Sequence, residues 1–174
     1  MKVKDVMRAS QLVHCGPQTN LQEAAQLMQV ANCGVLPVLN KDERVMGIIT
    51  DRDICLAMTK DHSWSHSRLP VSEVMSNEVH YVYENDNLTT ALHKMRIYYV
   101  GRLPVVDEYG KLKGILSIHN LFCKALIEQE DLGHLSSSGE NIVKTVKALS
   151  DRYALRRHRE EIEELKKMEL HFVL

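Results

Sequence analysis

The stretch Gly47–Asp53, which reads GIITDRD, decides the fold of this chain. Two β-branched residues between a glycine and a threonine are typical of a buried strand. Thr50 and Asp53 follow at the point where a helix would begin, and a hydroxyl or carboxylate there can cap the unpaired N–H groups of the helix. We therefore predict an apolar strand that ends in hydroxyl and carboxylate groups.

The same pattern returns as Gly114–Asn120, which reads GILSIHN, at an offset of 67 residues from Gly47 to Gly114. The opening segments Val3–Met7 and Val71–Met75 also match, at an offset of 68 that a single insertion explains. The chain is therefore a tandem repeat.

Each copy is predicted to read helix, strand, hairpin, strand, helix. The first helices open at Asn20 and Asn87, where apolar residues recur at helical spacing. Pro37 and Pro104 cannot donate to a sheet ladder, so we expect them at an edge or a bulge that leaves backbone groups for a ligand. The remaining expected elements are the strands Gly34–Leu39 and Gly101–Val106 and the closing helices Asp51–Lys60 and Ile118–Glu130.

The composition excludes several functional classes. With 22 basic and 23 acidic residues the 174-residue chain carries a formal net charge of −1, so no global field attracts nucleic acid or an anionic membrane. The N-terminus lacks the apolar run of a signal peptide, and no segment reaches the ~18 apolar residues that cross a bilayer. We expect a cytoplasmic protein without a membrane or nucleic-acid partner.

The cysteines and histidines predict no metal site. The cysteines show no CxxC pair and are expected to be reduced, buried thiols. His62 and His66 could share a helical face as metal ligands, but without a third ligand nearby we interpret Asp61–Arg68 as a flexible connector. The four cysteines are Cys15, Cys33, Cys55 and Cys123.

A change of composition past Glu130 predicts a separate tail. Leu132–Gly139 is a hinge rich in helix breakers, after which apolar residues return at helical spacing. We predict a helix from Ile142 to about Leu170 that packs on the repeats or on a second subunit. The expected division is residues 1–67 for the first repeat with its connector, 68–131 for the second repeat, and 132–174 for the hinge and helix.

From Val3 to about Glu130 the chain resembles a tandem pair of CBS domains, often called a Bateman module. The features that carry the resemblance are the Val-x-x-Val-Met openings, the Gly-x-x-Pro-Val strands, the Gly-Ile-Ile-Thr-x-x-Asp strand end and the doubling. The resemblance implies an α/β (α+β) fold of two β-α-β-β-α repeats related by a pseudo-twofold axis, with the tail as a helical extension. It also implies a homodimeric regulatory sensor that binds adenine nucleotides or adenosyl ligands between the repeats.

The chemistry of the residues agrees with a nucleotide site. The Asp53 carboxylate can accept hydrogen bonds from the two ribose hydroxyls, Thr50 can bind a phosphate or ribose oxygen, and the helix N-terminus that follows would favour the phosphate. Similar family members place a phosphate-binding arginine at the position of Arg102. The residues expected around the adenine are Ile48, Leu103 and Pro104.

The second cleft departs from the pattern twice. Asn120 stands in the place of Asp53, and Val35 in the place of Arg102, so a carboxylate and a guanidinium are both missing. We therefore predict a second, weaker site. Its residues are Val35, Leu36, Pro37, Ser117, His119 and Asn120.

Two functional classes compete. No Ser/His/Asp grouping, HExxH motif or Walker loop is present, so we predict that the chain is not an enzyme and holds no catalytic cofactor. The expected ligand is AMP, ADP, ATP or S-adenosylmethionine, and the regulated partner is unknown. The alternative is a protein-interaction or dimerisation module without a ligand, in which Thr50 and Asp53 only cap a helix and Arg102 forms an internal ion pair.

Overall fold

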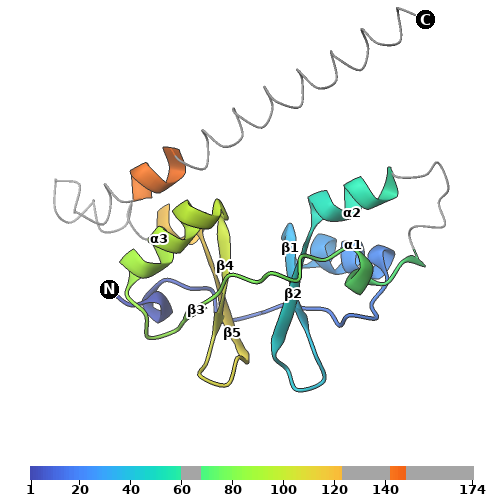
Figure 1. Cartoon of the computed structure of the whole chain (residues 1–174), viewed down its shortest axis with the longest axis horizontal. Helices are drawn as coiled ribbons and strands as arrows, with labels where there is room; N and C mark the ends of the chain where they lie inside the picture. Colours follow the sequence, from blue (N-terminus) through green and yellow to red (C-terminus); the bar gives the residue numbers. More distant parts are fainter. Residues whose placement is uncertain (60–67, 123–141, 148–174) are drawn as a thin grey trace, which may run out of the picture. The chain divides into compact units, whose positions relative to one another are not determined.

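The computed structural model of the chain describes residues 1–59, 68–122 and 142–147 (Figure 1). They form two units, one made of Met1–Asn87 with Leu103–Leu116 and the other of Leu88–Arg102 with the chain from Ser117 on. The connector with His62 and His66 lies outside the described residues. So do Cys123, the predicted end of the closing helix at Glu130, and the predicted tail helix beyond residue 147.

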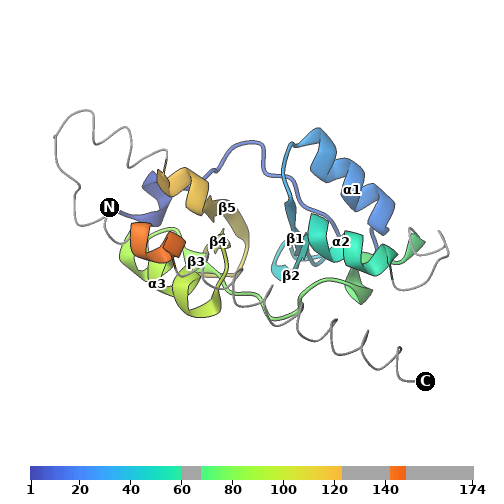
Figure 2. The same cartoon turned by 90° about the horizontal axis from the view of Figure 1, so that it is seen from above.

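The first copy is a β-hairpin covered by two helices. Its elements are α1 (Leu21–Val30), β1 (Val35–Leu39), β2 (Val45–Thr50) and α2 (Asp51–Met58). The two strands pair antiparallel with Val35 opposite Thr50. The helices pack on each other, α1 also on β1 and α2 also on β2 (Figure 2). Asn20 caps α1 by accepting a hydrogen bond at 2.8 Å from the Glu23 N–H, a contact typically worth about 1 kcal/mol.

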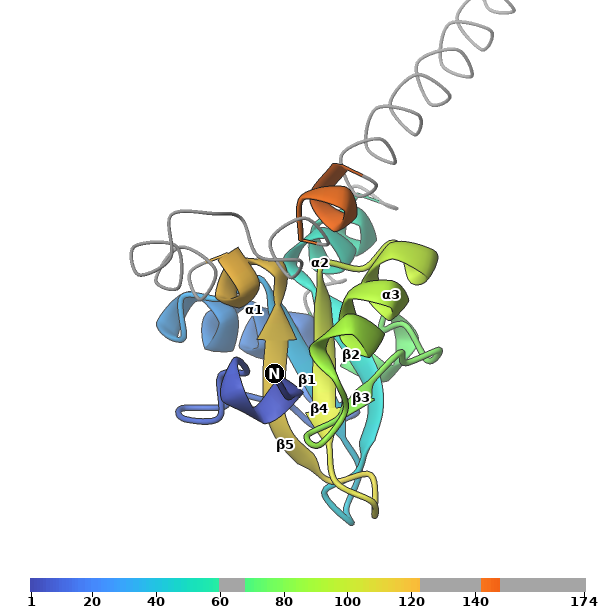
Figure 3. The same cartoon turned by 90° about the vertical axis from the view of Figure 1, so that its left-hand side faces the viewer.

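The second copy repeats the strand arrangement. β3 (Val82–Tyr83), β4 (Arg102–Val106) and β5 (Leu112–Ser117) form one sheet in the order β3-β4-β5, with β3 parallel to β4 (Figure 3). In the second unit, α3 (Leu88–Tyr98) buries Ala91 and Met95, as its spacing predicts, and residues 118–122 begin the closing helix. Residues 142–147 are also helical, with Ile142 buried. The expected α+β class with two similar repeats is confirmed.

One expectation about the prolines is wrong. Cys15 forms a parallel bridge to Val38 on the outer side of β1, and its N–H donates to the Pro37 carbonyl at 3.1 Å. The Pro37 carbonyl is therefore used inside the fold and not left for a ligand.

The opening segment of each copy packs on the other copy. We call Val3–Met7 with Arg8 the first opening and Val71–Met75 with Ser76 the second opening. In the first opening, which includes η1 (Val3–Asp5), the Val3 N–H donates to the Asp86 carbonyl at 3.0 Å. Arg8 and Ile115 of β5 then donate to each other's carbonyls at 2.9 and 3.0 Å. The first opening thus extends the sheet of the second copy.

The second opening does the same for the first copy. It includes η3 (Val71–Glu73), and the Val71 N–H donates to the Thr19 carbonyl at 2.7 Å. Ile48 of β2 and Ser76 exchange hydrogen bonds at 3.1 and 2.9 Å. Val71 is fully buried in the core of the first copy, so each copy is completed by the opening of the other.

A glycine inside β2 and a glycine inside β5 each make room for the methionine of an exchanged opening. A Cβ atom on Gly47 would collide with the Met75 sulfur. A Cβ atom on Gly114 would lie 2.7 Å from the Met7 sulfur and 3.0 Å from the Arg8 carbonyl oxygen. The glycine and the methionine therefore recur together, because each glycine leaves the space that a methionine side chain fills.

Candidate functional site

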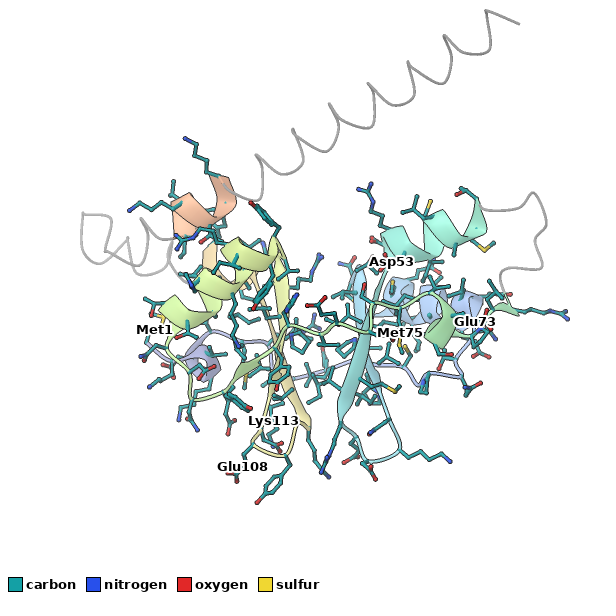
Figure 4. The ribbon with its side chains drawn as sticks, in the orientation of Figure 1. Met1, Asp53, Glu73, Met75, Glu108 and Lys113 are labelled. Carbon is teal, nitrogen blue, oxygen red and sulfur yellow. The ribbon has the colours of Figure 1, made fainter. Side chains whose placement is uncertain are left out.

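Thr50 and Asp53 form a reciprocal cap where β2 passes into α2. The Thr50 N–H and hydroxyl both donate to Asp53 Oδ2, at 2.9 and 2.7 Å, and the Asp53 N–H donates to Thr50 Oγ1 at 3.2 Å. Figure 4 labels Asp53 at the start of α2. Three hydrogen bonds between two half-buried residues fix the orientation of the carboxylate.

The cap uses only one oxygen of the Asp53 carboxylate. Among the residues that the structure describes, none donates a hydrogen bond to Asp53 Oδ1. An ionised carboxylate oxygen can accept two hydrogen bonds, and bonds to ionised acceptors are the stronger ones. The first motif therefore holds one oxygen rigid and offers the other as an open, charged acceptor.

The N-terminus of α2 is not open to a phosphate, contrary to our expectation. Its first three N–H groups already donate, from Asp51 to the Gly34 carbonyl at 3.3 Å, from Arg52 to Asp51 Oδ1 at 2.8 Å, and from Asp53 to Thr50. Two carboxylates also occupy the first turn, where they neutralise the positive end of the helix dipole. These N–H groups are therefore not available to a phosphate.

Sequence reasoning missed the role of Gly34 and Asp51. A Cβ atom on Gly34 would lie 2.6 Å from Asp51 Oδ2. The absence of a side chain at Gly34 therefore leaves room for the Asp51 carboxylate beside the cap. The signal was available, because Ile118 stands at the position of Asp51 in the second copy. The pair of carboxylates is a feature of the first copy alone.

Ser117 and Asn120 form the same cap with different chemistry. The Ser117 N–H and hydroxyl donate to Asn120 Oδ1, at 3.1 and 2.5 Å, and the Asn120 N–H donates to Ser117 Oγ at 3.1 Å. Because the Ser117 N–H requires an acceptor, the amide oxygen faces inward and the Asn120 NH₂ group faces outward as a donor. The first motif thus offers a negative acceptor and the second a neutral donor.

The other predicted site residues vary in exposure. Arg102, at the start of β4, is exposed and makes no hydrogen bond or ion pair with another described residue, so the internal ion pair of the alternative interpretation is not found there. Its approach to Asp53 stays a prediction, because the two residues belong to different units. His119 is exposed and Ile48 half-buried, whereas five residues are buried: Val35, Leu36, Pro37, Leu103 and Pro104.

The cysteines do not behave alike. Burial raises the pKa of the Cys15 thiol to about 11, and Cys33 is half-buried and donates to the Val35 carbonyl at 3.4 Å. Cys55 is exposed on α2, so the expectation of buried thiols is wrong for it. Within residues 1–59, 68–122 and 142–147, no cluster of three or more His, Cys, Asp or Glu residues could hold a metal ion.

The family model of the CBS domain matches residues 3–60 and 71–124. The chain therefore belongs to the CBS-domain family and carries two CBS domains in tandem, as its repeat predicts. No helix in the described part of the chain is long and apolar enough to span a membrane.

Similar proteins include the CBS domain-containing protein YhcV of Bacillus subtilis, which is 38% identical over 119 residues, 68% of this chain and 81% of YhcV. Among solved structures, CBSX2 in complex with AMP is 27% identical with a TM-score of 0.65, over 74% of this chain and 98% of that one. The CBS domain pair of protein MJ0100, in complex with 5-methylthioadenosine and S-adenosyl-L-methionine, is 24% identical with a TM-score of 0.64. This similarity covers 75% of this chain and 98% of the MJ0100 chain.

Proposed function

We propose that this chain is a regulatory sensor that binds an adenine nucleotide and has no reaction of its own. The observation that carries the proposal is the open Oδ1 oxygen of Asp53, which the cap with Thr50 holds in place. The complex of the similar protein CBSX2 with AMP supports this ligand class. In this proposal residues 1–67 and 68–131 are the two repeats, and residues 132–174 are the hinge and the C-terminal helix.

The ribose binds at the first motif. Its two adjacent hydroxyls are donors, and Asp53 Oδ1 is a charged acceptor that can receive both. Arg102 receives the phosphate, because the N–H groups at the start of α2 are used and Asp51 would repel it. The residues around the adenine are Ile48, Leu103 and Pro104.

AMP or ADP is the ligand we propose first, with ATP and S-adenosylmethionine as further adenosyl candidates. The second motif binds more weakly, because its outward group is the neutral Asn120 amide. We assign to it the residues Val35, Leu36, Pro37, Ser117, His119 and Asn120.

Calorimetry with AMP on Asp53→Asn tests the proposal. An asparagine can keep the cap through its amide oxygen, as Asn120 does, so the substitution removes only the open charged acceptor. Losing a charge-assisted hydrogen bond worth ~1.5–3 kcal/mol weakens binding roughly tenfold to a hundredfold. Asn120→Ala is the matched control with a small effect. Equal losses in the two variants, or no binding of any adenosyl compound to the wild type, contradict the assignment.

Protein interaction is the second candidate function. Large apolar side chains are exposed on both of the helices that follow the two motifs, Leu56 on α2 and Phe122 in the helix that begins after Ser117. We propose a cytoplasmic homodimer through the helices that follow Thr50 and Ser117, which would pass ligand binding to a partner protein. A dimer that forms while the wild type binds no adenosyl compound would favour this function over nucleotide sensing.

A further inference from the structure

The first unit contains a cavity of about 310 Å³ that neither nucleotide motif lines. Its apolar walls are Leu12, Leu39 and Leu112, and four of its polar residues are His14, Glu43, Lys111 and Lys113. Figure 4 labels Lys113 on β5, near the turn that joins β4 to β5. This volume is at the lower end of the range for sites of small organic ligands, roughly 300–1,000 Å³.

Backbone pairing forms the cavity where three segments meet. The segment from Arg8 to Cys15 runs from a hydrogen-bonded pairing with Ile115 to a parallel bridge with Val38, and so carries Leu12 and His14 between the two sheets. The two hairpin ends are joined by the Val45 N–H, which donates to the Gly110 carbonyl at 3.2 Å. Backbone pairing therefore sets the positions of the three segments, while the side chains of His14, Glu43, Lys111 and Lys113 are exposed at the mouth of the cavity.

The carboxylates of the cavity are already engaged. Glu43 Oε2 pairs with Lys111 Nζ at 3.1 Å. Asp107 Oδ1 accepts the N–H groups of Tyr109 and Lys111, at 3.0 and 2.9 Å, inside its turn. By contrast, neither His14 nor Lys113 makes a hydrogen bond or an ion pair with any residue that the structure describes. An ammonium group and an imidazole are left for a ligand.

Comparison of the two copies shows that the fold does not require these polar groups. At the offset of 67 residues, Tyr81 stands in the place of His14 and Met46 in the place of Lys113. Gly110 likewise stands in the place of Glu43. Tyrosine and glycine thus replace His14 and Glu43 in the second copy, and methionine replaces Lys113 in the first, so neither copy needs these polar groups to form its strands.

We propose that this cavity binds a small organic carboxylate with a short apolar tail. The Lys113 ammonium and the His14 ring bind the carboxylate, and the three leucines receive the tail. A cationic ligand would be repelled by Lys113, and the carboxylates of Glu43 and Asp107 would repel a doubly charged phosphate about twice as strongly as a singly charged carboxylate. The site is independent of the proposed nucleotide site, since the two share no residue.

Titration of the ¹⁵N-labelled full chain with hexanoate, followed by NMR, tests this site. Saturable shifts are expected at the amides of Leu12–His14 and Lys111–Lys113, and hexan-1-ol should bind at least about tenfold more weakly because it lacks the charge. Lys113→Met, which installs the residue of the first copy, should weaken hexanoate by a similar factor. Lys144→Met, at an exposed lysine of the second unit, is the matched control and should change nothing.

Three results would overturn the proposal. The first is the absence of saturable shifts at these amides. The second is an equal effect of Lys113→Met and Lys144→Met on hexanoate binding. The third is displacement of hexanoate by saturating AMP, which would assign the cavity to the nucleotide site. Failure of AMP itself to bind would overturn the nucleotide proposal and leave the hexanoate result unaffected.

Discussion

At the scale of single residues, the two caps differ by the outward group of one side chain, an oxygen in Asp53 and an NH₂ group in Asn120. Both side chains use one oxygen to receive the N–H and hydroxyl of the preceding Thr50 or Ser117. The outward atom is therefore not needed for the cap. We expect its chemistry to decide which ligand groups each motif binds.

We expect Asn120→Asp to strengthen the second, weaker site until it binds AMP measurably. The new carboxylate keeps the cap with Ser117 and turns a charged acceptor outward, as Asp53 does. Affinity at this second site should stay below that of the first, because Val35 stands at the position that is equivalent to Arg102. Calorimetry should show the binding stoichiometry rising from about one to two. An unchanged stoichiometry would show that the outward atom does not decide ribose binding.

Cys15 should make stability depend on pH in the alkaline range. Because burial raises the pKa of its thiol to about 11, the unfolded chain loses the proton at lower pH than the folded one. The stabilisation is complete below the pKa of the unfolded thiol and is lost as pH rises through the folded value. Urea unfolding at pH 8 and pH 10.5 should show a larger loss for the wild type than for Cys15→Ala. Equal losses would contradict the burial argument.

At the scale of elements, the strands and helices follow from the sequence with small changes. The helix predicted from Asn20 runs over Leu21–Val30, and the strand predicted over Gly34–Leu39 begins one residue later, at Val35. Caps and apolar spacing are local signals, so they can be recognised without a structure. The cap of Thr50 and Asp53 could be predicted for the same reason.

The exchange of the openings could not be predicted from local pattern. The match between Val3–Met7 and Val71–Met75 shows that the openings are equivalent, but either packing partner fits the same residues. Partner choice depends on contacts between distant segments, such as Val3 with Asp86. For a related reason, the sequence did not predict that the N–H groups at the start of α2 are already hydrogen-bonded. The Asp51 N–H donates to the carbonyl of Gly34, which lies outside the helix.

The contact between Gly47 and Met75 should be visible as a coupling energy. Gly47→Ala places a methyl group against the Met75 sulfur and should cost about 1–3 kcal/mol of stability by overpacking. In a Met75→Ala background that clash is absent, so the same substitution should cost much less. Urea unfolding of the four proteins of this cycle measures the difference. Additive effects would show that the methionine does not lie against the glycine in solution.

At the scale of the whole molecule, we expect a homodimer held by exposed apolar helix residues. Leu56 is 49% exposed on α2, and burying such a side chain contributes roughly 1.5–3 kcal/mol. Leu56→Asp should therefore weaken the dimer, whereas Val30→Asp, at the exposed end of α1, is the matched control. Sedimentation at micromolar concentration provides the measurement. A wild-type chain that sediments only as a monomer would rule the dimer out.

The exchanged openings also bear on the order in which the protein is made. A ribosome that has completed the Thr50–Asp53 motif has not yet made Ser76, with which Ile48 of β2 exchanges its hydrogen bonds. The segment Val3–Arg8 is synthesised first, but its hydrogen-bond partners Asp86 and Ile115 are made only later. The first copy therefore cannot close during its own synthesis, so we expect it to fold only once the second opening has left the ribosome.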